Sequence, residues 1–144
     1  MTAHDGVGIM AGMDWERLRE VFRRYPEIRA VYLFGSAAEG RARPDSDLDL
    51  GILADDPRLA ARKLELLAEL VRAGFDRVDL VFLDEEADLV LAYEAVRPNV
   101  VVYARPDFDR GGTYSRIVRK FLDFQYFLRH QRAALKRRLT HGSA

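Results

Sequence analysis

Apolar positions recur in two alternating patterns along the chain, and together they predict a mixed α/β domain. Short apolar and β-branched runs predict four strands, over residues 29–34, 47–53, 77–83 and 99–103. Apolar residues at helical spacing predict helices over residues 14–25, 57–73 and 85–95, between and before those strands. We therefore expect a small mixed sheet flanked by helices, in one domain over residues 13–140 that follows a flexible leader, residues 1–12.

A long amphipathic helix is predicted at the C-terminal end, over residues 113–139. One apolar face of this helix is formed by Ile117, Phe121, Phe124, Leu128 and Leu135. The helix predicted after Pro57 carries an apolar stripe made of Leu59, Leu64, Leu67, Leu70 and Val71. Each stripe is expected to pack against the sheet or against a partner.

The composition excludes several classes of protein. The 144 residues include no cysteine, which rules out disulfides and thiolate metal sites, and the three histidines have no ligand spacing that would suggest zinc. The longest apolar runs have the length of strands, so no transmembrane helix is expected. The N-terminal residues do not resemble a signal peptide, and a cytoplasmic location follows as the default.

The net charge of zero conceals an uneven distribution of charge. Residues 110–138 contain nine Lys or Arg residues and a single acid, Asp123, which gives this segment a net charge of +8. Such a basic segment suits an anionic partner or nucleic acid, and it equally suits a solvated helix face.

Three aspartates are the candidate catalytic and metal-binding residues. Asp47 and Asp49 lie two residues apart in a predicted strand, so both side chains point to the same face, while the alternate leucines and isoleucine of this strand point into the core. Asp79 lies on the next predicted strand and joins them if the two strands are neighbours. Clustered carboxylates favour hard cations, and two Mg²⁺ ions can bridge a triphosphate and align a phosphoryl transfer.

A Gly-Ser pair lies ten residues before the first of these aspartates. Gly35 allows the backbone to approach a phosphate closely, and Ser36 begins a predicted helical turn whose amides can bind it. Arg41 and Arg43 lie in the intervening loop, where a guanidinium can reach phosphate oxygens or remain in solvent. These four residues are the candidate nucleotide-binding set.

The segment GSAAEGRARPDSDLDL, with Gly35-Ser36 and Asp47-x-Asp49, resembles the signature of the DNA polymerase β-like nucleotidyltransferase superfamily. The short chain, the Val78–Val81 strand and the aromatic, basic terminal helix are similar to its minimal nucleotidyltransferase (MNT) branch. The resemblance implies a polymerase β-like fold in which Asp47 and Asp49 bind Mg²⁺ with the phosphates of ATP. It further implies that Asp79 completes the site and assists deprotonation of the acceptor, while Gly35 and Ser36 hold the phosphates.

MNT proteins of this kind commonly act as antitoxins paired with a HEPN-domain ribonuclease toxin. The resemblance therefore implies transfer of AMP from ATP to a tyrosine hydroxyl of that toxin, with the C-terminal helix as the expected contact surface. Three alternatives stay open from the sequence: a small-molecule acceptor, an RNA acceptor, and a non-catalytic antitoxin that neutralises by binding alone.

Overall fold

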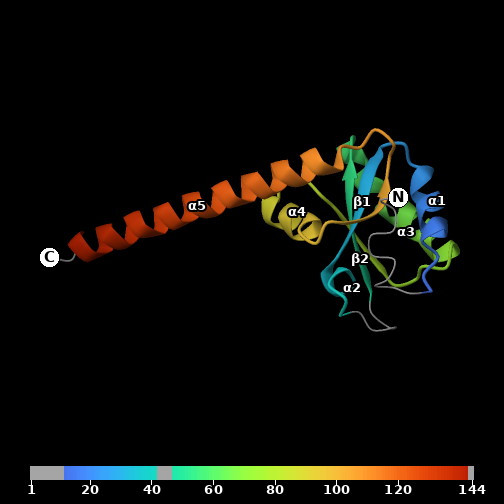
Figure 1. Ribbon diagram of the computed structural model, residues 1–144, viewed down its shortest axis with the longest axis horizontal. Coiled ribbons are helices and arrows are strands. Elements are labelled where there is room, and N and C mark those ends of the chain that lie inside the picture. Colours follow the sequence, from blue (N-terminus) through green and yellow to red (C-terminus); the bar gives the residue numbers. More distant parts are fainter. Residues whose placement is uncertain (1–11, 42–46, 143–144) are drawn as a thin grey trace.

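Four strands form one mixed sheet in the computed structural model, which describes residues 12–41 and 47–142 (Figure 1). The strands are β1 (Ile28–Phe34), β2 (Leu48–Ala54), β3 (Val78–Phe82) and β4 (Val100–Ala104), in the order β3-β2-β1-β4. β1 is antiparallel to both β2 and β4, whereas β2 and β3 are parallel. The predicted small mixed sheet is therefore confirmed, while the proposed leader lies outside the described residues apart from Gly12.

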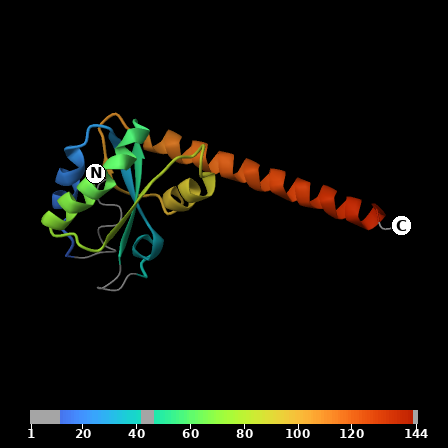
Figure 2. The ribbon, with the colours of Figure 1, turned by 180° about the vertical axis from the view of Figure 1, so that it is seen from behind.

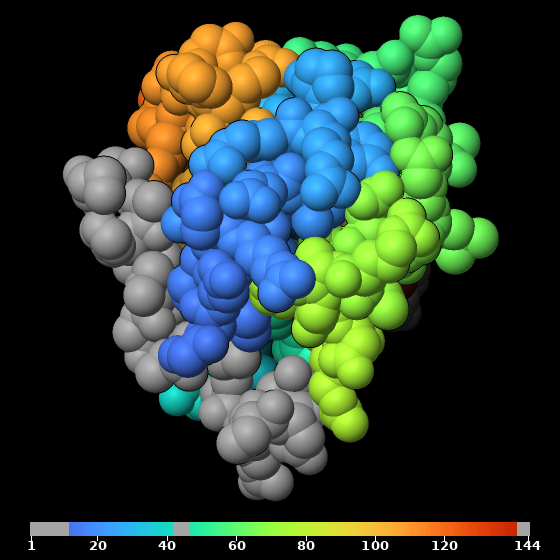
Figure 3. Space-filling model, turned by 90° about the vertical axis from the view of Figure 1, so that its right-hand side faces the viewer, coloured from blue at the N-terminus to red at the C-terminus, as the bar shows by residue number. Residues whose placement is uncertain are grey.

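The described helices cover both faces of this sheet. They are α1 (Trp15–Arg23), α2 (Gly35–Ala38), the 3₁₀-helix η2 (Pro57–Arg62), α3 (Lys63–Arg72), α4 (Leu89–Val96) and α5 (Arg110–Gly142). The helices α1 and α3 lie side by side and form the face of the body that Figure 3 shows. The helices α4 and α5 cover the opposite face of the sheet.

Strand periodicity divides the core into two layers. On β2, Leu48, Leu50 and Ile52 point toward α1 and α3, as the sequence predicted. The alternate position Leu53 points toward α4 and α5, where it packs with Tyr32 of β1. Because Asp49 alternates with Leu48 and Leu50, it lies on the α4 side of the sheet.

The predicted stripe on the helix after Pro57 is partly wrong. Leu64 and Val71 are 82% and 54% exposed, while Leu66, which the prediction left out, is fully buried. Residues 57–62 form a 3₁₀-helix with about three residues per turn, so the phase of the stripe changes where α3 begins. A single helical period over the whole segment therefore misplaced Leu64 and Val71, whereas Leu67 and Leu70 lie on the core side as predicted.

Two helix starts also differ from the predictions. The helix expected over residues 85–95 begins at Leu89, because the Asp88 side chain accepts a hydrogen bond from the Leu91 amide and caps it. The helix expected from residue 113 begins at Arg110, and the Asp109 side chain accepts a hydrogen bond from the Gly112 amide at 3.0 Å. The glycines of this turn therefore lie inside the first turn of α5 rather than before it.

The helix α5 extends far beyond the body of the protein (Figures 1 and 2). Ile117 is buried against the sheet, whereas Phe124 and Leu135 of the predicted apolar face are 38% and 53% exposed. The expectation that this face packs onto the sheet thus holds only for the start of α5. Within the described residues, no helix combines the length and the apolar character needed to cross a membrane.

Ion pairs fix the start of α5 to the loop before α4. Arg116 donates to Glu85 at 2.8 Å, and the Lys120 ammonium lies 2.9 Å from both Glu85 and Glu86. Next to them the rings of Tyr93 and Phe121 stack at 3.8 Å between centroids. These contacts set the direction in which α5 leaves the body.

We predict that Glu85→Gln loosens this attachment and lowers the free energy of unfolding by about 1 kcal/mol at neutral pH. The hydrogen bond from Arg116, with that from Lys120, lowers the pKa of Glu85 from 4.5 to about 2. A lowered carboxyl pKa stabilises the fold above pH 4.5, and the contribution disappears as the pH falls toward 2. Thermal unfolding across this pH range, with Glu20→Gln on α1 as control, measures the effect; equal melting temperatures at neutral pH would contradict it.

Candidate active site

Three side chains form a row across neighbouring strands at one end of the sheet. Asp49 on β2 pairs with Asp79 on the parallel strand β3 and with Phe34 on the antiparallel strand β1. Side chains at paired positions share a face, so the two carboxylates and the ring lie together. The expectation that Asp79 joins the first carboxylates because β2 and β3 are neighbours is thus met by the register.

Asp47 lies immediately before β2 and is exposed. Its charge contributes to the electrostatics of Asp49, as does that of Asp79. The half-buried Asp49 is the central carboxylate of the three, with an exposed aspartate on either side.

Gly35 determines how closely the backbone approaches Asp49. A Cβ atom built on Gly35 would lie 2.2 Å from Oδ2 of Asp49, far inside van der Waals contact. Gly35 also has a φ of +71°, a conformation that other residues rarely adopt. The turn from β1 into α2 therefore requires glycine for two separate reasons.

The loop from α2 carries the other predicted phosphate-binding residues. The Ser36 carbonyl accepts a hydrogen bond from the Arg41 amide at 2.9 Å, which closes the turn after α2. The Arg41 guanidinium is exposed and lies 3.1 Å from Glu39, which in turn lies 3.9 Å from Arg97. Arg43 lies outside the described residues.

The electrostatics of the site favour a bound cation. Burial raises the pKa of Asp49 above its usual range, and the neighbouring charges of Asp79 and Asp47 raise it further. Burial and the neighbouring negative charges each disfavour the ionised form of Asp49 when no cation is bound. A cation between the carboxylates removes both the repulsion and much of the desolvation cost.

The donors fit a hard cation shared with a phosphate. Carboxylate oxygens are the ligands that Mg²⁺ prefers, and Mg²⁺ at phosphate sites commonly uses one or two carboxylates, waters and substrate oxygens. Over residues 12–41 and 47–142, no group of three or more His, Asp or Glu side chains is arranged to hold a metal by itself. The geometry therefore suits a site that the substrate helps to complete rather than a closed protein cage.

Sequence reasoning missed two residues beside this site. Phe34 is half-buried and lies directly across from Asp49, so its ring contributes an apolar wall to the site. Arg97 follows α4 and reaches Glu39 next to α2. The sequence predicted Phe34 only as the last residue of the strand over residues 29–34, and nothing in the sequence links Arg97 to a loop almost 60 residues earlier.

The sequence profile of a family described as "Polymerase beta, Nucleotidyltransferase" matches residues 16–108. The protein adenylyltransferase MntA of Shewanella oneidensis is 37% identical over 71 residues, which cover 49% of this chain and 50% of that protein. The protein adenylyltransferase MntA of Aphanizomenon flos-aquae is 29% identical over 99 residues, which cover 60% of this chain and 65% of that protein. The chain thus spans about half to two thirds of the length of these relatives.

Solved structures share the fold at lower sequence identity. A crystal structure of a toxin-antitoxin with AMP-PNP matches with a TM-score of 0.67 and 23% identity, over 85% of this chain and 98% of that chain. A complex of tri-AMPylated Shewanella oneidensis HEPN toxin with MNT antitoxin matches with a TM-score of 0.62 and 22% identity, over 88% of this chain and 98% of that chain. These matches establish the common architecture of the domain.

We predict that Gly35→Ala destabilises the fold by about 1–3 kcal/mol and displaces the Asp49 carboxylate. Gly40→Ala is the matched control, because Gly40 has a similar φ of +73° but no atom within 4 Å of an added Cβ. Both variants carry the strain of a left-handed alanine, and only the first also displaces Asp49. Equal losses in chemical denaturation would contradict the close packing of Gly35 on Asp49.

We predict that Asp49→Asn raises the free energy of unfolding at neutral pH, by about 0.5 kcal/mol, because it removes like-charge repulsion. A raised carboxyl pKa means that the folded state holds the proton more tightly, so wild-type stability falls as the pH rises through the pKa of Asp49. The advantage of the variant should therefore disappear below the usual carboxyl range. A variant less stable than wild type at pH 7, in the absence of divalent cations, would contradict this account.

Proposed function

This chain belongs to the polymerase β nucleotidyltransferase family, and from that premise we propose that it is an Mg²⁺-dependent protein adenylyltransferase of the antitoxin type. In this proposal it transfers AMP from ATP to a tyrosine hydroxyl of a HEPN-domain toxin and thereby neutralises the toxin. The reaction takes place in the cytoplasm, where ATP is available.

The observation that carries the proposal is the register of Asp49 with Asp79, directly against Gly35. This arrangement places a carboxylate pair directly beside the glycine turn at which β1 ends and α2 begins. Two relatives of this chain are named protein adenylyltransferases, which supports a protein acceptor. The likeness to the fold of an MNT antitoxin is consistent with the same assignment.

Asp47 and Asp49, together with Asp79, are the residues that would hold Mg²⁺ in this proposal. When bound, Mg²⁺ supplies positive charge that neutralises the phosphate oxygens during the transfer. The raised pKa of Asp49 gives the site a pH dependence, because only the deprotonated carboxylate is a ligand.

The nucleotide would be positioned by the turn into α2. Gly35 allows the Asp49 carboxylate to lie directly against this turn, and the amide and hydroxyl groups of Ser36 can donate hydrogen bonds to phosphate oxygens. Arg41 lies beside this turn and pairs with Glu39. When ATP binds, the Arg41 guanidinium could leave Glu39 and pair with a phosphate, which carries more negative charge. Arg43 is assigned the same role from the sequence alone.

Asp79 would act on the acceptor. As a carboxylate it accepts the proton of the tyrosine hydroxyl while the hydroxyl oxygen bonds to the α-phosphorus of ATP. The bond between the α-phosphorus and the bridging oxygen breaks, and pyrophosphate leaves. The exposed position of Asp79 suits this role, because the acceptor must approach from solvent.

We predict that this protein, incubated with ATP, Mg²⁺ and a cognate HEPN-domain toxin, adds one or more AMP units to that partner. Asp49→Asn and Asp79→Asn should slow the transfer by at least about 100-fold, because each removes a group that acts on the reacting atoms. Glu20→Gln on α1 is the control and should retain the wild-type rate. Intact mass spectrometry of both chains measures the transfer.

The other outcomes of this experiment separate the alternatives. A stable complex without any added mass would favour neutralisation by binding alone. AMP on an added RNA or small molecule, and none on protein, would assign a different acceptor. Transfer at the wild-type rate by Asp49→Asn would contradict the site assignment itself.

A further inference from the structure

The apolar stripe of α5 continues beyond the part of the helix that packs on the body. Ile117, Phe121, Phe124, Leu128 and Leu135 are separated by alternating steps of four and three residues, with Gln131 at the one polar step. This spacing is typical of a helix that packs lengthwise along a second helix. The stripe therefore has the form of one half of a helical pair.

Only the first part of this stripe has a partner in the chain. Ile117 is fully buried, and the Phe121 ring stacks on Tyr93 of α4. Beyond them, Leu135 and Leu139 are 53% and 68% exposed, and no described segment lies beside that part of the helix (Figure 1). The seam, defined here as the stripe side of residues 124–139, is about 24 Å long.

A groove connects the seam to the body. It has a volume of about 700 Å³ and lies between α5 and the segment over residues 85–90. Phe124 and Phe127 form its apolar wall on α5, and Leu89 and Val90 line it on the other side. The rest of its lining includes one cation and four acids, which are Lys120, Glu85, Glu86, Asp88 and Asp123. The groove therefore suits an apolar helix end, and any acidic borders of a docked helix would lie against the basic residues farther along α5.

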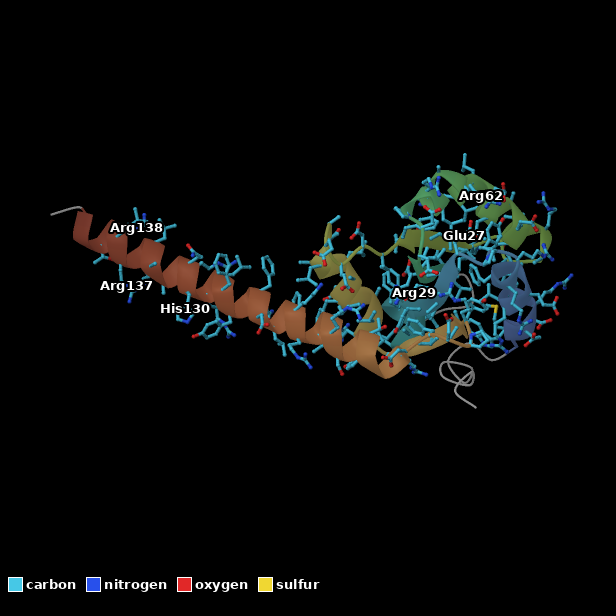
Figure 4. The ribbon with its side chains drawn as sticks, turned by 90° about the horizontal axis from the view of Figure 1, so that it is seen from above. Glu27, Arg29, Arg62, His130, Arg137 and Arg138 are labelled. Atoms are coloured by element: carbon cyan, nitrogen blue, oxygen red, sulfur yellow. The ribbon has the colours of Figure 1, made fainter. Side chains whose placement is uncertain are left out.

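The charge of the seam region selects the kind of occupant. Residues 124–139 include five Arg or Lys residues and no acid. Figure 4 shows Arg137 and Arg138 on the distal part of α5, far from the body. A second copy of this helix would bring two strongly basic segments together, which is unfavourable at physiological ionic strength. A helix whose apolar stripe is bordered by acidic residues is complementary in both shape and charge.

The seam also lies on the appropriate side of the protein for catalysis. The helices α4 and α5 cover the sheet face on which Asp49 and Asp79 lie. Ala95 of α4 packs on this face so closely that a Cβ on Gly51, two residues after Asp49, would lie 3.2 Å from it. A protein held along the seam therefore approaches the same face of the sheet as the carboxylates.

We propose that residues 124–139 of α5 are the docking surface for the acceptor protein, which contributes an amphipathic helix with acidic borders. The proposal rests on the proposed function, because the docked protein is the substrate of the transfer. Docking along the seam holds the acceptor beside the active-site face and raises its local concentration there.

The test compares two double variants that carry the same charge change at the same spacing. Leu128→Glu with Leu135→Glu places two carboxylates in the seam, and Tyr126→Glu with Ala133→Glu places two on the opposite side of the same helix. The seam variant should bind the cognate HEPN-domain toxin at least about 100-fold more weakly than wild type, because carboxylates would be buried in an apolar contact. The control variant should bind within about threefold of wild type, since its side chains remain in solvent.

Circular dichroism and ATP binding are measured on both variants and should be unchanged, because all four positions lie beyond the body. Wild-type affinity should fall as salt is raised, as expected for a basic seam and an acidic helix. Calorimetry gives the affinities, and light scattering gives the mass of this protein alone.

Several results would overturn the proposal. They are equal binding of both double variants, a wild-type homodimer that the seam variant dissociates, and AMP transfer to the partner without any stable complex. A stable complex lost only in the seam variant, with no AMP transfer by wild type, would instead support the docking surface and refute the proposed function. Absence of both binding and transfer would refute both.

Discussion

The contact between Gly35 and the carboxylate of Asp49 is the constraint around which this site is built. The pairing of β1 with β2 ends at Phe34 and Asp49, and the chain then turns sharply at Gly35. A side chain at this position would occupy the space of the carboxylate. The same turn that ends β1 thus also fixes the position of Asp49 and leaves α2 beside it.

The two faces of the sheet have different roles: one contributes the larger apolar layer, and the other carries the candidate site residues. The face covered by α1 and α3 buries a continuous apolar layer, which includes Leu48, Leu50 and Ile52 of β2. The opposite face is covered by α4 only as far as Gly51, and the next position on that face is Asp49. Three carboxylates can therefore lie near one another at a cost to stability, because the larger apolar layer on the other face maintains the fold.

Much of this arrangement was predictable from the sequence, for local reasons. The alternation of side chains in β2 predicted that Leu48 and Leu50 lie in the core. The same alternation predicted that Asp47 and Asp49 share the opposite face. The proximity of Asp79 required only that consecutive strands be neighbours. The role of Arg43 remains a prediction, because this residue lies outside the described part of the chain.

The errors arose where long-range packing or a change of helix type decided the outcome. The change from 3₁₀ to α geometry at Lys63 reversed the expected burial of Leu64 and Leu66. The sequence predicted the apolar face of α5 correctly, but it could not predict how much of that face the body of the protein covers. The place of Arg97 near α2 depends on packing between α4 and the sheet, which no local pattern encodes. Asp79 lies on β3, the edge strand of the described sheet, with β2 as its single neighbouring strand. The next residue, Leu80, is fully buried and anchors this short strand in the core, while the Asp79 side chain is exposed. Solvent therefore reaches this carboxylate without any opening of the sheet.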